Sequence, residues 1–272
     1  MRFGRRGLAD EVAPMSARLQ GPVVLVTGGA AGLGEAIVSR LSADNYRVVV
    51  ADVDEPRGQQ VADNLVAVGR TVEPMTVDVT SEGEVAACVD AIVERHGRLD
   101  ALVCSAAVET RAAVVDCDDD EWQRVLDVNV KGPFLCMKHA IPAIAKSGGG
   151  AVVVMSSVLG VIGSPGYAAY CASKGALNNL AKQAAIEHAP ENVRVNVVAP
   201  SATDTGLFAR VAAATDDPEG MMNMVARNTP MQRLGTSEEV AATVAFLCSP
   251  GAGFISGAII PLDGAMAARR IL

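Results

Sequence analysis

The sequence predicts an α/β domain in which a doubly wound parallel sheet of about seven strands is flanked by helices. Short runs rich in β-branched residues alternate with longer amphipathic segments, which is typical of consecutive βαβ units. The residues in these runs are nearly all apolar, as in strands that are buried on both faces of a sheet. No repeat, low-complexity tract or linker divides residues 21–266, so we expect a single domain.

Seven runs have the composition of strands. They lie at Val23–Val26, Val48–Asp52, Val72–Val77, Ala101–Cys104, Ala151–Ser156, Val193–Ala199 and Ala258–Leu262. Residues 1–20 precede them, carry four arginines and lack the continuous apolar stretch of a secretory signal. We expect residues 1–20 to be a flexible N-terminal extension. One alternative is that translation truly starts at Met15, and another is that the segment is a transit peptide. Residues 21–272 then form the folded domain.

The composition excludes several classes of partner. The 272 residues are 50% hydrophobic but only 3% aromatic, so the core must be built from Ala, Val, Leu and Ile. A net charge of -8 makes nucleic acid and anionic membranes poor partners. Apolar runs stop after four or five residues, far short of the roughly 18 needed to span a membrane. The six cysteines form no C-x-x-C pair, which favours a cytoplasmic protein. The three histidines are isolated from one another, so we expect no metal site.

A glycine-rich turn, Thr27–Gly34, connects the first predicted strand to the helix after it. Glycines at such a turn let the backbone approach a pyrophosphate, which binds at the N-terminus of the helix. An ordinary strand-to-helix turn is the alternative, but Asp52 ends the second strand 18 positions beyond Gly34, where dinucleotide-binding domains carry an acid. The pattern therefore predicts a Rossmann fold. The turn residues expected at the cofactor are Thr27, Gly28, Gly32, Leu33 and Gly34.

Asp52 also predicts which dinucleotide binds. A carboxylate at this position accepts hydrogen bonds from the adenosine ribose hydroxyls and repels a 2'-phosphate, so NAD is favoured over NADP. Neither Ala31 nor Val53 supplies the basic side chain that a 2'-phosphate requires. The alternative is that Asp52 is only a solvated residue at the end of its strand.

Tyr170 and Lys174 are spaced to lie on one face of a helix, one turn apart. A tyrosine with a pKa near 10 is a poor base at neutral pH, and a neighbouring ammonium lowers that pKa. A lone pair of this kind is usually a surface pair. Tyr167 could line the same cleft, but it has no lysine four residues on.

Together these motifs resemble the classical short-chain dehydrogenases/reductases over residues 21–265. The T-G-x-x-x-G-x-G spacing of the turn and the Y-x-x-x-K pair are both forms that this family uses. The resemblance implies that Lys174 also holds the nicotinamide ribose, and that Ser157, rather than Ser156, binds the reacting oxygen. Asn129 resembles the family's fourth catalytic position, where an interrupted helical turn holds a water on the proton path.

Other segments resemble cofactor-contacting elements of the family. Asp78 and Val79 look like the pair that contacts adenine. Residues 200–205 resemble the loop that meets the nicotinamide carboxamide: Pro200 and Thr205 match, and Thr203 could offer its amide. The family's N-N-A-G element appears as C-S-A-A over 104–107, which leaves Ser105 and Ala106 for backbone contacts and removes the usual asparagine.

The resemblance implies reversible hydride transfer between NAD(H) and a secondary alcohol or ketone. Tyr170 would be the general base or acid and Ser157 would orient the oxygen. Two alternatives remain open: an NADPH-dependent 3-oxoacyl-type carbonyl reductase, against which Asp52 argues, and a non-catalytic dinucleotide sensor or scaffold. The family also pairs its long helices, here near 118–145 and 167–188, which implies a homotetramer.

The segment 206–230 is the candidate substrate lid. It is rich in Leu, Val, Phe and Met, and adaptable methionines suit a flap that excludes water from hydride transfer. We expect a mainly apolar secondary alcohol or ketone as substrate, cyclic ones among them, with Met222 as a lid residue. Asp204 and Arg210 are nearby charges that could meet a polar substrate group instead.

Overall fold

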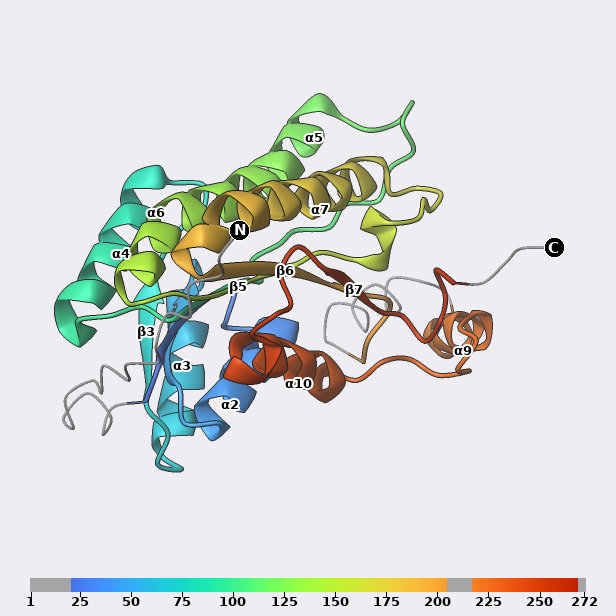
Figure 1. Ribbon diagram of the computed structural model, residues 1–272. Helices are drawn as coiled ribbons and strands as arrows, with labels where there is room; N and C mark the ends of the chain where they lie inside the picture. The colour runs from blue at the N-terminus through green and yellow to red at the C-terminus, as the bar shows by residue number, and fades with distance from the viewer. Residues whose placement is uncertain (1–20, 205–216, 269–272) are drawn as a thin grey trace, which may run out of the picture.

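The computed structural model describes residues 21–204 and 217–268. It confirms a single parallel sheet of seven strands in the order β3-β2-β1-β4-β5-β6-β7 (Figure 1). The strands are β1 (Val23–Thr27), β2 (Arg47–Asp52), β3 (Val72–Thr76), β4 (Ala101–Cys104), β5 (Gly150–Met155), β6 (Val193–Pro200) and β7 (Ile259–Leu262). The expected N-terminal extension, residues 1–20, lies outside the described residues.

Helices cover both faces of the sheet, with α4, α6 and α7 on one side and α2, α3 and α10 on the other (Figure 1). The α-helices are α2 (Gly32–Ala43), α3 (Glu55–Val66), α4 (Glu82–His96), α5 (Asp119–Leu126), α6 (Gly132–Lys146), α7 (Ala168–His188), α9 (Pro218–Asn228) and α10 (Ser237–Cys248). Shorter helical turns are η1 (Asp127–Lys131), η2 (Val158–Gly160), η3 (Ala189–Glu191) and η4 (Pro250–Ala252). Among the described residues, no helix is long and apolar enough to cross a membrane.

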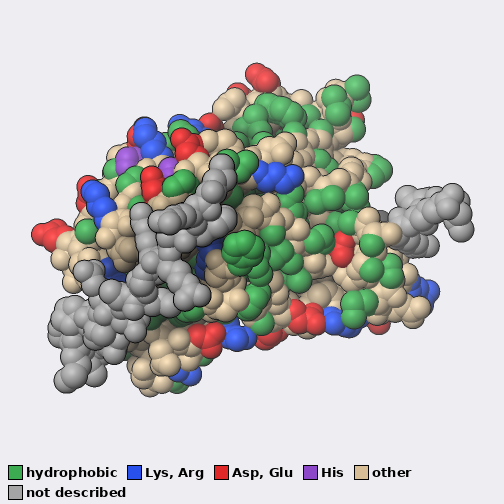
Figure 2. All heavy atoms as spheres, viewed as in Figure 1, with side chains coloured by type: hydrophobic (Ala, Val, Ile, Leu, Met, Phe, Trp, Pro, Cys, Tyr) green, Lys and Arg blue, Asp and Glu red, His purple; other side chains and the backbone are tan. Residues whose placement is uncertain are grey.

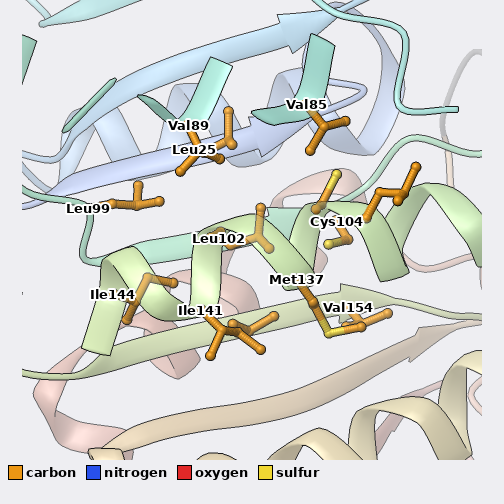
Figure 3. Packing of buried hydrophobic residues seen from close by; sticks show 14 of the residues in the cluster. Leu25, Val85, Val89, Leu99, Leu102, Cys104, Met137, Ile141, Ile144 and Val154 are labelled. Carbon is orange, nitrogen blue, oxygen red and sulfur yellow. The ribbon is translucent and has the colours of Figure 1, made fainter. Parts of the chain in front are cut away.

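Two aliphatic clusters fill the space between the sheet and its helices. On the α6 side, Met137, Ile141 and Ile144 pack against Leu102 of β4 and Val154 of β5 (Figure 3). The other cluster packs α2, α3 and α10 against the opposite face. The members of both clusters are almost all Val, Leu, Ile, Ala, Met and Cys, as the low aromatic content of the sequence predicts.

The two edge strands differ from the prediction that every strand is buried on both faces. Strand β3 begins with a buried Val72, continues with half-buried residues and ends at an exposed Thr76, and β7 has no buried residue. An edge strand has a neighbour on one side only, so more of its surface stays accessible. The predicted ends at Val77, Ser156 and Ala258 are each displaced by one residue from the observed ones.

Strands β1 and β4 lie side by side where the direction of strand order reverses, and Thr27 pairs with Cys104 at their carboxyl ends. Connections from adjacent strands diverge to opposite faces at this point, which opens a crevice beyond the strand ends. The fold therefore places its natural binding site over the carboxyl ends of β1 and β4.

Candidate active site

A cleft of about 1090 Å³ lies over these strand ends. It brings together most of the residues that the sequence predicts for the site, although they come from segments far apart in the chain. Those that line the cleft are Gly28, Gly32, Leu33, Gly34, Asp52, Val53, Asp78, Val79, Ser105, Ala106, Ser157, Tyr170, Lys174, Pro200 and Thr203. Thr27 and Asn129 are buried directly behind them, and Thr205 lies outside the described residues.

The glycine-rich turn is shaped for a close approach of backbone to ligand. At Gly28 the backbone has a φ of 66°, and an added Cβ would lie 2.6 Å from the Ala106 nitrogen, so a side chain cannot fit. Gly32 has a φ of 57° and open space where a Cβ would stand, on the side that lines the cleft. The N-terminus of α2 thus faces the cleft without a side chain in the way, and these residues fit the pyrophosphate of a dinucleotide.

Asp52 serves both the turn and the cleft. Its Oδ2 accepts a hydrogen bond of 3.0 Å from the Ala30 amide, and its Oδ1 accepts one of 3.1 Å from the Asp54 amide. These bonds fix the carboxylate at the rim of the cleft, beside the exposed Val53. Sequence reasoning missed Arg57, which lines the same end of the cleft from the first turn of α3. The helical spacing after Asp54 could have identified it.

Asp78 and Val79 line the cleft just after β3. The Asp78 carboxylate accepts hydrogen bonds of 2.8 Å from both the amide and the hydroxyl of Thr80, which holds it in a tight turn. Val79 is buried, and an added Cβ on Gly132 would lie 2.8 Å from its side chain. This wall of the cleft is therefore packed directly against the start of α6.

Segment 104–107, which lacks the asparagine usual in the family, is held in place by Thr27. The Thr27 Oγ1 accepts hydrogen bonds from the amides of Ser105, at 3.3 Å, and Ala106, at 3.5 Å. Cys104 is buried next to Cys136, in the aliphatic cluster below the cleft. The turn after β1 and the segment after β4 are consequently joined across the crevice.

Asn129 sits in a π-helical turn, η1, between α5 and α6, where the sequence predicts an interrupted helix. It is fully buried. Its Oδ1 accepts a hydrogen bond of 2.8 Å from the Val108 amide, and its Nδ2 donates to the Val108 carbonyl at 2.9 Å and to the Ser173 hydroxyl at 3.2 Å. In this arrangement its side chain positions the backbone that follows β4, and the water-holding role stays a prediction.

Ser157, Tyr170 and Lys174 converge from β5 and α7. The Lys174 Nζ lies 5.5 Å from the centroid of the Tyr170 ring and donates a hydrogen bond of 2.9 Å to the Met155 carbonyl. The Ser157 hydroxyl lies near enough to the Tyr170 oxygen to lower its pKa by hydrogen bonding. Ser156 lines the cleft too, but its hydroxyl donates to the Lys174 carbonyl at 3.0 Å.

The prediction that Lys174 and an oxidised nicotinamide together lower the pKa of Tyr170 concerns the cofactor-bound enzyme and stays a prediction, and the net effect of the protein groups alone is in the other direction. Burial raises the pKa of Tyr170 above its ordinary value, the Glu109 carboxylate adds to the increase, and Ser157 opposes it. Burial also lowers the pKa of Lys174 to about 8, while Glu109 acts to raise it. A low-dielectric environment disfavours both charged forms, and here that effect exceeds the attraction between them.

The structure describes the loop after β6 as far as Asp204. Pro200 accepts a hydrogen bond of 3.4 Å from the Ser157 hydroxyl, and Thr203 is buried and bridges to Gly235. The Asp204 carboxylate accepts a hydrogen bond of 2.9 Å from the Ser237 amide and does not line the cleft. Of the two charges that could have met a polar substrate group, Asp204 thus lies away from the described lining, and Arg210 lies outside the described residues.

Helix α9 forms one wall of the cleft, and the expected lid is described only over residues 217–230. Met221, Met224 and Val225 line the cleft at i, i+3 and i+4, whereas Met222 is not among the lining residues. Met222 is therefore a poor position for testing the lid. Helical periodicity counted from Asp217, whose side chain caps α9 through the Gly220 amide, would have separated Met221 and Met224 from it.

Sequence reasoning also missed a polar end of the cleft. Glu109 and Arg111 line it from the segment between β4 and α5, together with Tyr167. Beyond them the chain exposes Val114 and Val115 at 83% and 90%. Figure 2 shows hydrophobic side chains gathered at the upper right, where Figure 1 places the segment that leads into α5. An irregular segment has no periodicity that could have indicated these orientations.

Comparisons with known proteins agree with this geometry. A family model described as enoyl-(acyl carrier protein) reductase matches residues 28–266. The chain is 36% identical to 2-(S)-hydroxypropyl-CoM dehydrogenase 3 of Xanthobacter autotrophicus, over 93% of this chain and 100% of the relative. It is 37% identical to cis-4-hydroxycyclohexanecarboxylate dehydrogenase of Sinomonas cyclohexanicum, over 89% of this chain and 95% of the relative.

A solved structure of levodione reductase superposes with a TM-score of 0.88 at 29% identity, covering 92% of this chain and 98% of that one. The likeness thus extends over the sheet, the helices and the cleft together. The motif spacing, the order of the strands and the matches over almost the whole length lead to one conclusion: the chain belongs to the short-chain dehydrogenase/reductase family.

Proposed function

We propose that this protein is an NAD-dependent dehydrogenase that interconverts a secondary alcohol and a ketone. The observation that carries the proposal is the convergence of Ser157, Tyr170 and Lys174 in the cleft that the glycine-rich turn enters from its other end. That convergence would be unnecessary in a protein that only senses or carries a dinucleotide. The family membership supports an oxidoreductase acting on CH-OH groups.

Each of these residues has a definite task in alcohol oxidation. Tyr170 removes the hydroxyl proton, and Ser157 donates a hydrogen bond to the same oxygen and holds it in place. Lys174, kept in position by the Met155 carbonyl, stabilises the phenolate charge and would hold the nicotinamide ribose. A bound nicotinamide supplies the two-electron acceptor and a positive charge that favours the phenolate. In the reductive direction Tyr170 returns the proton.

NAD is the proposed cofactor because of Asp52. Its carboxylate is fixed at the rim of the cleft by the Ala30 and Asp54 amides, so it cannot easily turn away from the ribose. A 2'-phosphate placed there would meet a negative charge. The neighbouring Val53 provides no compensating cation.

The proposed substrate class is a mainly apolar secondary alcohol, with cyclic alcohols included. Met221, Met224 and Val225 of α9 give the cleft an apolar wall. A relative whose name specifies a hydroxycyclohexane compound supports a ring-shaped substrate. Residues 206–216, together with α9, are proposed as the lid.

One experiment tests the proposal directly. Purified protein is mixed with NAD or NADP and with cyclopentanol, cyclohexanol, 2-butanol or sorbitol, and reduced cofactor is followed by its absorbance. We expect turnover with NAD and the cycloalkanols. In the contrary case, the protein binds NAD but oxidises none of these alcohols and reduces none of the corresponding ketones. That result would instead support a sensor or scaffold.

A second candidate, an NADPH-dependent carbonyl reductase of the acyl-carrier type, is favoured by one observation. The exposed guanidinium of Arg57 lies at the same end of the cleft as Asp52 and could meet a 2'-phosphate. The description of the matching family model points to acyl-carrier chemistry as well. A higher kcat/KM for acetoacetyl-thioester reduction with NADPH than for cycloalkanol oxidation with NAD would select this candidate.

We also propose that the protein is a cytoplasmic homotetramer. Helices α6 and α7 border an apolar groove in which Phe134 is 46% exposed, next to Leu126, Val130 and Leu180. A second copy placed on this groove would bury these side chains. Sedimentation at micromolar concentration tests the assembly: a species of four chains is expected, and a 28.0 kDa monomer alone contradicts it.

A further inference from the structure

The cleft has charged groups where a purely apolar substrate would need none. Glu109 and Arg111 line it on the side of Tyr167, opposite the methionines of α9. The Glu109 carboxyl group is half-buried, whereas Arg111 is exposed at the mouth. Neither residue belongs to the cofactor end of the cleft, which is formed by the glycine-rich turn and Asp52.

The segment that carries these charges is anchored at both ends. At one end, Asn129 binds the amide and the carbonyl of Val108, at 2.8 and 2.9 Å. At the other, the Ala112 carbonyl accepts a hydrogen bond of 3.2 Å from the Ala168 amide, at the first turn of α7. Glu109 and Arg111 lie between these anchors, so their backbone is held relative to Tyr170.

The charges lie within the length of a small molecule from the reacting tyrosine. The Arg111 guanidinium carbon is 5.1 Å from the centroid of the Tyr167 ring, and that centroid is 6.3 Å from the centroid of the Tyr170 ring. Glu109 lines the cleft together with Tyr167, Tyr170 and Lys174, hydrogen-bonds to Tyr167, and acts electrostatically on all three. A six-membered ring whose hydroxyl meets Tyr170 would reach this polar end with its far side.

The opposite charges of Glu109 and Arg111 determine which chemical group of a substrate fits at this end of the cleft. An anion attracted by Arg111 would be repelled by Glu109, and a cation attracted by Glu109 would be repelled by Arg111. A neutral hydroxyl can donate a hydrogen bond to the carboxylate and accept one from the guanidinium, so it satisfies both groups. The apolar wall opposite then contacts the carbon skeleton.

We propose that Glu109 and Arg111 are specificity-determining residues that bind a second hydroxyl group of the substrate. The preferred substrate is accordingly a neutral cyclic diol, or the corresponding hydroxyketone in the reductive direction. This inference rests on the proposed alcohol dehydrogenase function and makes its substrate class more specific.

The test compares two substrates that differ by one hydroxyl group. The kcat/KM of the wild-type enzyme with NAD is measured for cyclohexanol and for cyclohexane-1,4-diol and cyclohexane-1,3-diol, each as separate cis and trans isomers. At least one diol should exceed cyclohexanol on the order of 10-fold or more, because its second hydroxyl gains hydrogen bonds to charged groups that cyclohexanol cannot make.

Variants then locate the effect. In Glu109→Met and Arg111→Met the diol-to-cyclohexanol ratio should fall toward one. This ratio is the informative quantity, because any effect of Glu109 on Tyr170 changes the kcat/KM values of both substrates by the same factor and cancels in the ratio. Asp120→Asn is the matched control: Asp120 lines the cleft from α5 but lies outside the anchored segment, so this variant should retain the ratio.

Three results would overturn the inference: no diol better than cyclohexanol, a ratio unchanged in both methionine variants, or a charged analogue that outperforms every diol. The charged analogues are 4-hydroxycyclohexanecarboxylate and 4-aminocyclohexanol. In each of these cases turnover of cyclohexanol leaves the proposed dehydrogenase function intact. Absence of turnover with every alcohol and both cofactors would remove the dehydrogenase function and this inference together.

Discussion

Asn129 holds Val108 by both of its backbone hydrogen-bonding groups, with the amide bound at 2.8 Å and the carbonyl at 2.9 Å. A side chain in a π-helical turn thereby supports an irregular segment 21 residues away in the chain. This contact connects the helix pair α5 and α6 to the wall of the cleft.

Replacing Asn129 by alanine should therefore affect both stability and substrate binding. The loss of both bonds to Val108 should lower the free energy of unfolding by about 2 kcal/mol or more, because buried backbone groups lose their partners. The KM for the alcohol should rise. Urea unfolding and steady-state kinetics measure the two effects. Lys131→Ala, which removes an exposed side chain from the same turn, should change neither, and equal effects from both variants would contradict the positioning role.

The two tyrosines of the cleft should respond very differently to substitution. Tyr170→Phe removes the proposed general base, so kcat should fall on the order of 100-fold or more. Tyr167→Phe keeps that base and should lose much less. NAD binding, measured by calorimetry, should persist in both variants. A Tyr170→Phe enzyme with a nearly normal kcat would show that the base lies elsewhere.

Cofactor preference should depend on the two charges at the adenosine end. Asp52→Ala should narrow the preference for NAD, since the repulsion of a 2'-phosphate is removed. Arg57→Ala should increase the preference for NAD over NADP if the Arg57 guanidinium contacts the 2'-phosphate of NADP. The measurement is the ratio of kcat/KM for the two cofactors in each variant. Comparable values for the two cofactors in the wild type would remove Asp52 from this role.

Two methionines of α9 provide a matched pair for testing the substrate wall. Met224 lines the cleft and Met222, two residues earlier, does not, although both are partly exposed. Met224→Asp should raise the KM for cyclohexanol on the order of 10-fold, because a charge then faces the apolar ring. Met222→Asp should leave it nearly unchanged. The same increase in both would indicate an effect on folding rather than on the substrate.

The pH dependence of oxidation should shift when Glu109 becomes neutral. The Glu109 carboxylate raises the pKa values of both Tyr170 and Lys174, so Glu109→Gln should lower both. Oxidation requires deprotonated Tyr170 and protonated Lys174, whose pKa is about 8. Both limbs of the kcat/KM profile should therefore move to lower pH, on the order of half a unit.

The control for this shift is Asp120→Asn, another acid that lines the cleft but is not among the main causes of the pKa shift of either residue. Its profile should coincide with that of the wild type. A Glu109→Gln profile that stays in place or moves to higher pH would contradict the electrostatic effect described for the cleft.

The elements that repeat along the sequence were the ones that sequence analysis could locate. The β-branched runs predict all seven strands to within a residue or two at their ends, because burial on both faces requires an unbroken apolar run. The motif spacing brought Tyr170, Lys174 and Ser157 into one cleft. Glu109 and Arg111 were missed because the orientation of an irregular segment depends on distant anchors such as Asn129.

The apolar residues of α9 could not be divided into those that line the cleft and those that do not. Identifying the inward face of α9 requires knowing where that helix begins, and Asp217 as its cap was not recognised. The electrostatic balance around Tyr170 could not be predicted either. It depends on how much water the folded chain excludes, and the linear sequence does not specify that amount.

The π turn at η1 also takes up one extra residue within a long helical rod. An α-helix advances about 100° per residue, and a π turn accommodates one residue more than an α turn does. Because the wider turn absorbs that residue, α5 and α6 keep nearly the angular phase of an uninterrupted α-helix. Deleting one residue from η1 should therefore leave Gln123 and Arg124 at the cleft, since uniform winding would replace the wider turn without rotating α5. The same deletion would remove the local widening that carries the Asn129 side chain to Val108. The extra residue thus changes one contact of the rod and leaves the orientation of its two halves unchanged.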